Sequence, residues 1–371
     1  MSALEDHQAQ RVQAAIDASL ASMVHGHNPV NTSSRTDTRP LRVALGVSGG
    51  RDSMVMLHAV SRTPLRQAVT LCAVHVHHGL SPHAEEWVQF TADACARLDV
   101  PLRVERVSVN RRAGESLEAL ARARRLEALF AGDVDVVALA HHADDQAETV
   151  LLQLLRGAGP DGLAAMPATR AGAGPTVLRP LLELPGAALE AYAHVHGVSW
   201  IEDESNTDTR FRRNAVRHRV APVLREVFPG YPLTLLRAAR HQAEAAMLLD
   251  DLAALDARAM ASADPVLGTC LDHRALATLV HAQPHRARNL MRWFLRAHQL
   301  PAPSTARLSN ALAQIAAWPA TSTASVAHAD AEIALSNGRV VIRRGQAKTA
   351  AGGRRASRES GHRPAIENCQ G

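Results

Sequence analysis

Residues 43–58 read VALGVSGGRDSMVMLH, and this stretch decides the fold of the chain. Residues 43–47 are apolar with β-branched ends, which predicts a buried parallel strand. Residues 54–60 are apolar at helical spacing without glycine or proline, which predicts a helix. The glycine turn SGGRDS lies between them. This order of elements predicts an anion site, because free N–H groups and the helix dipole face the turn.

The turn itself suits a phosphate. Its two glycines let the backbone approach closely, and its two serines add hydroxyl donors. It lacks the lysine of a Walker A loop and the spacing of GxGxxG. It resembles the PP-loop of the ATP pyrophosphatases, S-G-G-x-D-S, which cut ATP between the α and β phosphates and hold pyrophosphate. A glycine turn without a ligand is the alternative. The residues that this resemblance assigns to ATP are Ser48, Gly49, Gly50, Arg51, Asp52 and Ser53.

The composition points to an anionic partner. The chain has 371 residues, enough for two or three domains, and a formal net charge of +5. Lys348 is its only lysine, so arginine carries nearly all the positive charge. A GC-rich genome explains the choice of arginine but not the basic excess. Since guanidinium groups bind phosphates bidentately, the excess favours a partner such as nucleic acid.

Cysteine usage and hydropathy favour the cytoplasm. The four cysteines lie far apart without a C-x-x-C, which argues against a zinc ribbon or an iron–sulfur site. Scattered cysteines suit a reducing cytosol. No run approaches the roughly 20 apolar residues of a membrane span, and the N-terminus does not read as a signal peptide. We therefore expect a cytoplasmic protein without a membrane partner.

Strand and helix patterns alternate after residue 41. Residues 69–76, 102–109 and 134–140 predict strands, each followed by a helical pattern. Repeated βα units imply an α/β fold with a doubly wound parallel sheet. Ligands bind such sheets at the carboxyl ends of the strands. The turns after Val47, Val76 and Ala140 fall at those ends, so we expect them to share one site.

The turn after Ala140 is rich in carboxylates. Asp144 and Glu148 are four residues apart and share a helix face, with Asp145 beside them. Such a group beside a phosphate loop could hold Mg²⁺ or receive an ammonium group. An acidic helix cap is the alternative. We expect the two histidines at 141 and 142 to hydrogen-bond the loop, with metal ligation as the alternative.

These motifs together resemble the tRNA(Ile)-lysidine synthetases, in the order and spacing of that family over residues 41–345. The resemblance implies adenylation of the wobble cytidine of a tRNA, attachment of lysine at C2, and release of AMP and pyrophosphate. The matching stretches are LAHHADDQAET (139–149), LLRG (154–157), GLAAM (162–166), HVHHGL (75–80), DESNTD (203–208) and RNAVR (213–217).

The resemblance also implies roles for individual residues. Asp52 and Asp145 would hold Mg²⁺, while Asp144, Asp145 and Glu148 would hold lysine or act as its base. His77 would lie at the nucleotide, although the family usually has Asn there. Ser81 and Leu126 replace a family Arg and Tyr, so side-chain detail near the base differs.

Several arginines are candidates for phosphate or tRNA contacts. Arg122 and Arg125 share a helix face, with a solvated face as the alternative. Arg213 and Arg217 share another face. For these two, the alternative is an ion pair with the acidic turn at 202–204. In the last third of the chain, one basic helix carries Arg288, Arg292 and Arg296.

The strand pattern stops after Pro229. Helical patterns follow over 235–261, 273–280, 286–299 and 304–317, and residues 331–343 predict a hairpin that turns at Asn337-Gly338. We expect a smaller helical domain with a terminal hairpin after the α/β domain. Longer family members carry a further C-terminal domain after such a hairpin. Whether this protein recognises the acceptor stem of the tRNA therefore stays open. The domains that we expect are an N-terminal extension (1–40), a catalytic domain (41–229), a tRNA-binding domain (230–345) and a disordered basic tail (346–371).

The sequence thus predicts an ATP- and Mg²⁺-dependent ligase that joins L-lysine to a tRNA(Ile) with the anticodon CAU. One alternative is another PP-loop tRNA-modifying enzyme, such as a tRNA thiolase, whose relatives often use paired cysteines. A second is a tRNA-binding protein without catalysis. A low aromatic content of 3% argues against base stacking as the chief mode of RNA binding. The sequence does not decide whether the protein forms a homodimer.

Overall fold

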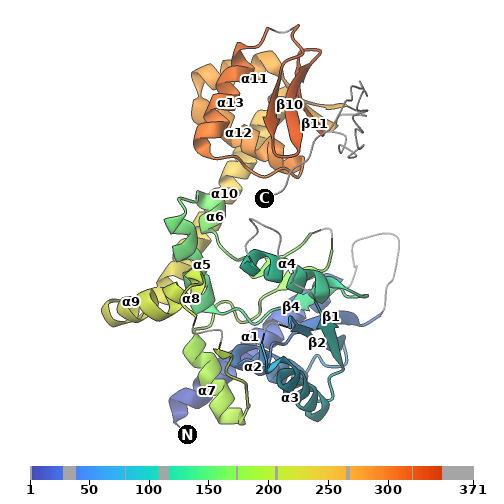
Figure 1. The fold of residues 1–371 in the computed structure, drawn as a ribbon, viewed down its shortest axis with the longest axis vertical. Helices are drawn as coiled ribbons and strands as arrows, with labels where there is room; N and C mark the ends of the chain where they lie inside the picture. Colours follow the sequence, from blue (N-terminus) through green and yellow to red (C-terminus); the bar gives the residue numbers. More distant parts are fainter. Residues whose placement is uncertain are drawn as a thin grey trace, which may run out of the picture. The chain divides into compact units, whose positions relative to one another are not determined.

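A computed structural model describes residues 2–27, 39–79, 81–107, 117–172, 174–204, 208–264, 268–319 and 321–344. The chain divides into two compact units, Met1–Ala246 and Met247–Gly371, which we describe separately (Figure 1). This division falls inside the helix α10 (Tyr231–Met260), whereas the sequence suggested a boundary near Pro229. The expected tail at 346–371 lies outside the described residues.

A six-stranded sheet forms the centre of the first unit. Its order is β3-β2-β1-β4-β6-β5, and all neighbours are parallel except β5 and β6. Since the sheet extends from β1 in both directions, the predicted doubly wound parallel sheet is confirmed. The third strand is shorter than expected. The strands are β1 (Leu41–Gly46), β2 (Val69–His77), β3 (Leu102–Arg106), β4 (Val136–Ala138), β5 (Thr169–Arg170) and β6 (Thr176–Leu178).

Helices cover both faces of this sheet because alternate residues of β1 point to opposite sides. Leu45 and Val47 join a core with α1, α2 and α7, whereas Ala44 packs with Leu129 of α4. The helices of the unit are α1 (Ala3–His27), α2 (Arg51–Ser61), α3 (Ala84–Arg97), α4 (Leu117–Phe130), α5 (Ala143–Leu155), α6 (Pro160–Leu163), α7 (Gly186–His196), α8 (Arg212–Ala215), a π-helical turn (Val216–Val220), α9 (Ala221–Val227) and the first part of α10.

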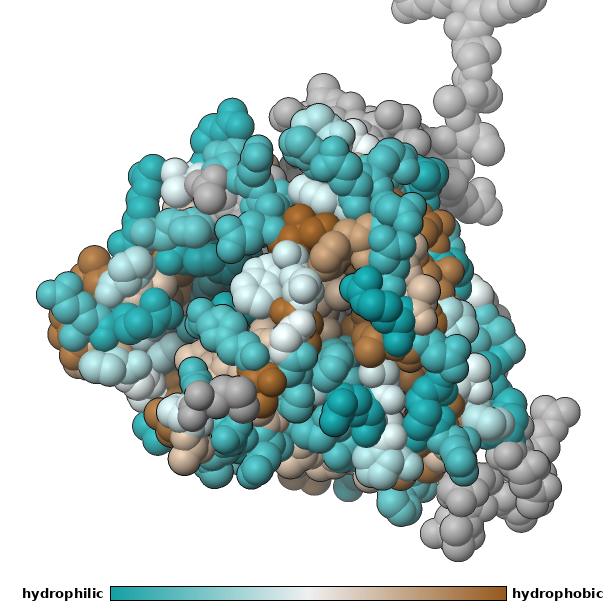
Figure 2. Space-filling model, turned by 90° about the horizontal axis from the view of Figure 1, so that it is seen from below, coloured by the Kyte–Doolittle hydropathy of each residue, from teal (hydrophilic) through white to brown (hydrophobic). Residues whose placement is uncertain are grey.

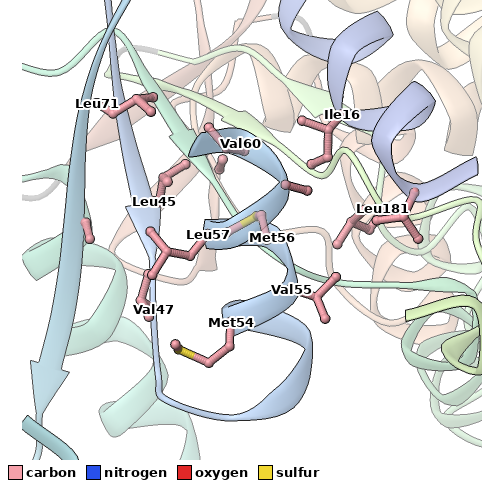
Figure 3. Close-up of a cluster of buried hydrophobic side chains, with 14 of the residues drawn as sticks. Ile16, Leu45, Val47, Met54, Val55, Met56, Leu57, Val60, Leu71 and Leu181 are labelled. Carbon is pink, nitrogen blue, oxygen red and sulfur yellow. The ribbon is translucent and has the colours of Figure 1, made fainter. Parts of the chain in front are cut away.

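The larger core fixes α2, the helix that follows the glycine turn (Figure 3). Val55, Met56 and Leu57 are fully buried, and they pack among side chains of β1, β2 and α1. The sequence predicted only an N-terminal extension over residues 1–40 and no core role for α1. Ile16 is nevertheless 0% exposed and belongs to the same core. Burial on several sides holds the start of α2 in place under the turn.

The second unit pairs helices with a five-stranded antiparallel sheet in the order β7-β8-β11-β10-β9. The predicted hairpin is confirmed as β10 (Ala331–Ser336) and β11 (Arg339–Arg344), and Asn337 and Gly338 at its turn both have positive φ. The other strands were not predicted, because they are short and poor in β-branched residues. The remaining elements are β7 (Ala261–Asp264), β8 (Gly268–Asp272), α11 (His273–Ala282), α12 (Pro284–Ala297), α13 (Thr305–Ala317) and β9 (Ser325–His328).

One face of the molecule is largely polar (Figure 2). Figure 2 shows one face, on which hydrophilic residues predominate and hydrophobic residues form separate small areas. None of the helices in the described ranges is both long enough and apolar enough to cross a membrane.

Candidate active site

The glycine turn connects β1 to α2 and is braced from within. Ser53 Oγ accepts from the Ser48 N–H at 3.1 Å and donates to the Gly50 carbonyl at 2.9 Å. Gly50 is the N-cap of α2, and no side chain of the described residues caps this helix. The first N–H groups of α2 therefore remain available to an anion, which is the arrangement that binds phosphates.

Gly49 has a φ of +90°, a conformation that only glycine adopts without strain. Its carbonyl accepts from the Ile201 N–H at 2.9 Å, which ties the turn to the segment after α7. A Cβ at this position would lie 3.3 Å from Ile201 Cδ1, so the close packing also requires glycine. The glycines of the motif thus set the shape of the loop, in addition to exposing its N–H donors.

His142 links the glycine turn to the start of α5. Its buried ring places Nε2 3.3 Å from Asp52 Oδ2 and 3.6 Å from Asp145 Oδ2, and Nδ1 3.4 Å from Asp144 Oδ2. Burial alone would lower the pKa of His142, but the hydrogen bond to Asp144 and the charges of Asp145 and Asp52 raise it to about 10. The ring is therefore an imidazolium, shared among three carboxylates.

The raised pKa of His142 bears on the hydrogen bonds of Nδ1. The Asp144 N–H also lies 3.3 Å from His142 Nδ1, a geometry in which only an unprotonated nitrogen could accept. Three carboxylates around the ring favour protonation of both nitrogens, so we assign the Nδ1–H to Asp144 Oδ2. The His142 N–H donates to Asp145 Oδ2 at 3.1 Å whichever state the ring adopts.

Asp52 lies in the first turn of α2, with its side chain 32% exposed. Burial acts to raise the pKa of its carboxyl, but His142 and Arg51 outweigh burial and lower it. Arg51 Nε donates to Asp52 Oδ1 at 2.9 Å. Asp52 is thus a partly exposed carboxylate that stays ionised at the edge of the phosphate loop.

Two arginines hold the two most buried carboxylates of α5. Arg213 donates from Nη2 to Asp145 Oδ1 at 2.9 Å and from Nε to Glu148 Oε2 at 2.8 Å. Arg217 donates to the same Asp145 oxygen at 2.9 Å and to Glu148 Oε1 at 2.6 Å. The side chains of Glu148 and Asp145 are 4% and 11% exposed, so they would be costly to bury without these partners.

The pKa shifts in this cluster follow from the pairing. Burial acts to raise the pKa of Asp145, but His142, Arg213 and Arg217 hold it well below its usual range. Burial acts to lower the pKa of Arg217, but Glu148 and Asp145 raise it. Arg217 lies in the π-helical turn, a rare conformation that is often found at functional sites.

Asp144 points to a different set of partners. Its Oδ2 accepts from the Gly186 N–H at 2.8 Å, and its Oδ1 accepts from Arg225 Nη2 at 3.2 Å. Burial would raise the pKa of Asp144, but His142, the Gly186 N–H and Arg225 lower it to about 2. A Cβ on Gly186 would lie 3.3 Å from Asp144 Oδ2, which explains the need for glycine.

The structure brings together the phosphate loop, the carboxylates of α5 and the Arg213–Arg217 pair. The arginines pair with Asp145 and Glu148, and not with the acidic turn at 202–204 that the sequence offered as their alternative. Sequence reasoning expected His142 to hydrogen-bond the loop, but it missed the contacts of this ring with Asp144 and Asp145 and the contact of Arg225. The contact of Arg225 could have been predicted from the sequence. Arg225 follows Arg217 by eight residues, so the two side chains fall on the same helix face.

Other predicted residues lie apart from this cluster. His77 ends β2, and its Nε2 is 3.4 Å from Glu85 Oε1. Arg125 Nε lies 3.4 Å from His78 Nε2, and the side chain of Arg122 lies outside the described residues.

The three predicted arginines of α12 belong to the second unit. Arg292 donates to Thr305 Oγ1 at 3.2 Å, and Arg296 pairs with Asp250. Arg286, on the same helix, pairs with the buried Asp256.

Comparison with known proteins agrees with this geometry. Residues 25–224 match the family model of the PP-loop domain, and residues 275–346 match that of the TilS substrate binding domain. Proteins named tRNA(Ile)-lysidine synthase are 48% identical over 280 residues in Azoarcus sp. strain BH72, 41% over 286 in Nitrosomonas europaea and 46% over 275 in Chromobacterium violaceum. The matches cover 75%, 76% and 73% of this chain but 60%, 60% and 61% of those relatives.

A solved structure supports the fold alone. The U34-tRNA thiolase NcsA from Methanococcus maripaludis, with its 4Fe-4S cluster, aligns with a TM-score of 0.50 at 15% identity. The alignment covers 65% of this chain and 80% of the thiolase. The resemblance that the sequence motifs carried is confirmed by the family matches. Because residues 25–224, more than half of the chain, match one family model, the chain belongs to the PP-loop domain family.

Proposed function

We propose that this chain is the ATP-dependent ligase that joins lysine to the wobble cytidine of a tRNA(Ile) with the anticodon CAU. The cytidine 2-oxygen attacks the α phosphorus of ATP, and pyrophosphate leaves. The lysine ε-amine then attacks C2 of the adenylated cytidine, and AMP leaves, which gives lysidine. The names of the relatives and their 41–48% identity support this activity, although the chain spans about three fifths of their length.

The observation that carries the proposal is the contact between His142 and Asp52. It joins two sites that the reaction needs side by side: a phosphate loop for adenylation and a carboxylate cluster for an amine. Both lie at the carboxyl ends of adjacent parallel strands, β1 and β4, where α/β sheets bind ligands. A ligase of this kind requires this proximity, because the amine must reach the carbon that ATP has activated.

In this proposal, the phosphate loop holds the triphosphate of ATP. The N–H groups at the start of α2 and the Ser48 hydroxyl would bind the β and γ phosphates, and the Ser53 hydroxyl would join them by turning from the Gly50 carbonyl to a phosphate. Arg51 would add a guanidinium. His77 would lie near the nucleotide base, at the end of the strand next to β1.

The carboxylate oxygens suit Mg²⁺. Asp52 Oδ2 and Asp145 Oδ2 both face His142 Nε2, so two hard oxygen donors already converge on one positive charge. No set of three or more such ligands gathers within the described ranges. Two carboxylates completed by phosphate oxygens and water match the usual binding of Mg²⁺. When bound, the ion would neutralise charge on the phosphates; Asp52, the more exposed of the two, would be its main ligand.

Asp144, Asp145 and Glu148 would receive lysine. A lysine ammonium that reaches Glu148 must share this carboxylate with the guanidinium groups already bound there. Arg217 is the more exposed of the two, at 38% against 23% for Arg213. We therefore propose that Arg217 leaves the Glu148 carboxylate and binds a phosphate when lysine enters. Arg213 keeps its contact with Glu148. One carboxylate of the group would accept the proton of the attacking amine.

The second unit would hold the tRNA. Its match to a substrate-binding family model and the arginines of α12, Arg288, Arg292 and Arg296, support this role. Arg122 and Arg125 of α4 would add phosphate contacts in the first unit. Binding of the tRNA would depend on a basic surface of matching shape. We place the protein in the cytoplasm. Its molecular mass in solution would decide between a monomer and a homodimer.

Nucleoside mass spectrometry tests the reaction. The tRNA is incubated with ATP and isotope-labelled lysine, digested and analysed for a cytidine with the added lysine mass. A thiolase would instead add sulfur, independently of lysine. That rival is disfavoured because its relatives often use paired cysteines, and the four cysteines of this chain include no C-x-x-C. Affinity for tRNA without ATP–pyrophosphate turnover would point to a non-catalytic binding protein.

A further inference from the structure

One hydroxyl beside the phosphate loop has no partner. Thr91, on α3, is 0% exposed, and within the described residues its Oγ1 makes no hydrogen bond. A buried hydroxyl without a partner costs free energy, so folded proteins contain few of them. Such a group indicates a bound water, a ligand or a second conformation of its neighbours.

The hydrogen bonding of Thr91 differs from that of two other helical threonines. Thr149 in α5 and Thr278 in α11 donate to the carbonyls of residues four positions earlier, at 2.8 and 3.0 Å. This local bond is the ordinary way for a helical threonine to satisfy its hydroxyl. Thr91 forgoes it, although a helical backbone carbonyl lies within reach in the preceding turn. Its hydroxyl therefore points away from α3.

The hydroxyl points toward Gly49. A Cβ built on Gly49 would lie 3.5 Å from Thr91 Oγ1, so the hydroxyl borders the space beside Gly49 that a side chain would fill. The Gly49 carbonyl is occupied by the Ile201 N–H. The other peptide of Gly49, which joins it to Ser48, is the remaining backbone group at this position. Gly49 gives this peptide freedom to rotate.

We propose that Thr91 is a positioning residue of the phosphate loop. Its hydroxyl bonds the Ser48–Gly49 peptide when the loop holds a polyphosphate, and it has no partner when the loop is empty. The free protein thus bears the cost of an unsatisfied hydroxyl, and the bound state recovers it. This inference rests on the proposed function, because it takes the loop to bind the phosphates of ATP.

The test compares Thr91→Val with Thr91→Ser and the wild type. Valine keeps the shape and removes the hydroxyl, and serine restores it. We expect Thr91→Val to leave the melting temperature of the free protein unchanged or higher, because it removes an unsatisfied group. We expect its dissociation constant for ATP, measured by calorimetry, to rise roughly three- to tenfold, the size of one hydrogen bond. Thr91→Ser should restore most of this affinity.

Thr278→Val is the matched control, because it removes a helical hydroxyl that has its ordinary local bond in the second unit. It should not change ATP affinity. A lower melting temperature of free Thr91→Val would overturn the inference, since it would mean that the hydroxyl already has a partner, such as a buried water. Unchanged ATP affinity in that variant would also overturn it. If the wild type itself failed to bind ATP, the proposed function would fail instead.

Discussion

His142 Nε2 lies 3.3 Å from Asp52 Oδ2, so the helix after β4 is tied to the loop after β1 by a charged hydrogen bond. The bond spans two adjacent strands of the sheet and places the carboxylates of α5 beside the phosphate loop. Since His142 also faces Asp144 and Asp145, its single positive charge is shared by three acidic groups. A change of charge at any one of them therefore affects the others.

Asp52→Asn should slow AMP formation by about 10²–10³-fold, because it removes a charge that orients the phosphates and their Mg²⁺. The amide keeps the shape of the side chain, so the fold should persist. The measurement is AMP released from labelled ATP in the presence of tRNA and lysine. Asp93→Asn is the control, because that carboxylate lies on the exposed side of α3 with Gln89 as its partner. AMP formation at the wild-type rate would remove Asp52 from the site.

Glu148→Gln should raise the KM for lysine while ATP–pyrophosphate exchange changes less. The amide keeps one acceptor for the two arginines but cannot balance their charge or hold an ammonium. Because a partly exposed Arg217 remains hydrated, we expect a stability loss of about 1–3 kcal/mol, below the cost of leaving a fully buried charge unpaired. Assays must therefore run well below the melting temperature of the variant.

The result separates two roles of Glu148. An unchanged KM for lysine, together with lower stability, would mean that Glu148 only pairs with Arg213 and Arg217. Asp161→Asn, on the short helix α6, controls for general loss of acidic charge in the unit.

Much of the first unit could be predicted from the sequence because its signals are local. The apolar run before the glycine turn and the apolar helix after it predict β1 and α2. The alternation of strand and helix patterns along the chain predicts the parallel sheet. The carboxyl ends of parallel strands then bring residues far apart in sequence to one place. This is why Asp52 and the carboxylates of α5 were expected together.

The pairing of charges could not be predicted in the same way. Arg213 follows Glu148 by 65 residues, and only the packing of α8 against α5 decides that they meet. The sequence offered nearer acidic partners for this arginine. The core role of α1 was missed for a similar reason: its buried residues at 9, 12, 16 and 20 become a core stripe only when α7 and α2 cover them.

Replacing Arg288, Arg292 and Arg296 together by Gln should weaken tRNA binding and flatten its dependence on salt. Each lost phosphate contact removes close to one unit from the slope of log K against log salt. Arg296 already pairs with Asp250, so we expect a change of about one to two units rather than three. ATP binding without tRNA should not change.

Arg286→Gln is the matched control on the same helix. Arg286 pairs with the buried Asp256, so its loss should lower stability and leave the salt slope nearly intact. The measurement is tRNA affinity against salt concentration for the wild type and both variants. An unchanged slope in the triple variant would mean that this face of α12 does not contact the RNA.

His58 should make the first unit less stable as the pH falls from about 6.5 to about 4. His58 Nδ1 lies 2.9 Å from Tyr192 Oη between α2 and α7, and burial, His196 and Arg62 lower its pKa to about 4. The unfolded chain binds a proton near pH 6.5 and the folded chain does not, so stability is lost across this window. A full shift would be worth about 3.4 kcal/mol, which partial exposure reduces to about 1–2 kcal/mol. The melting temperature of His58→Gln should therefore fall less between pH 7.5 and 5 than that of the wild type.

His241→Gln, which alters an exposed histidine of α10, should keep the wild-type pH dependence. Equal losses in His58→Gln and the wild type would mean that the His58 ring can take up a proton in the folded protein at little cost.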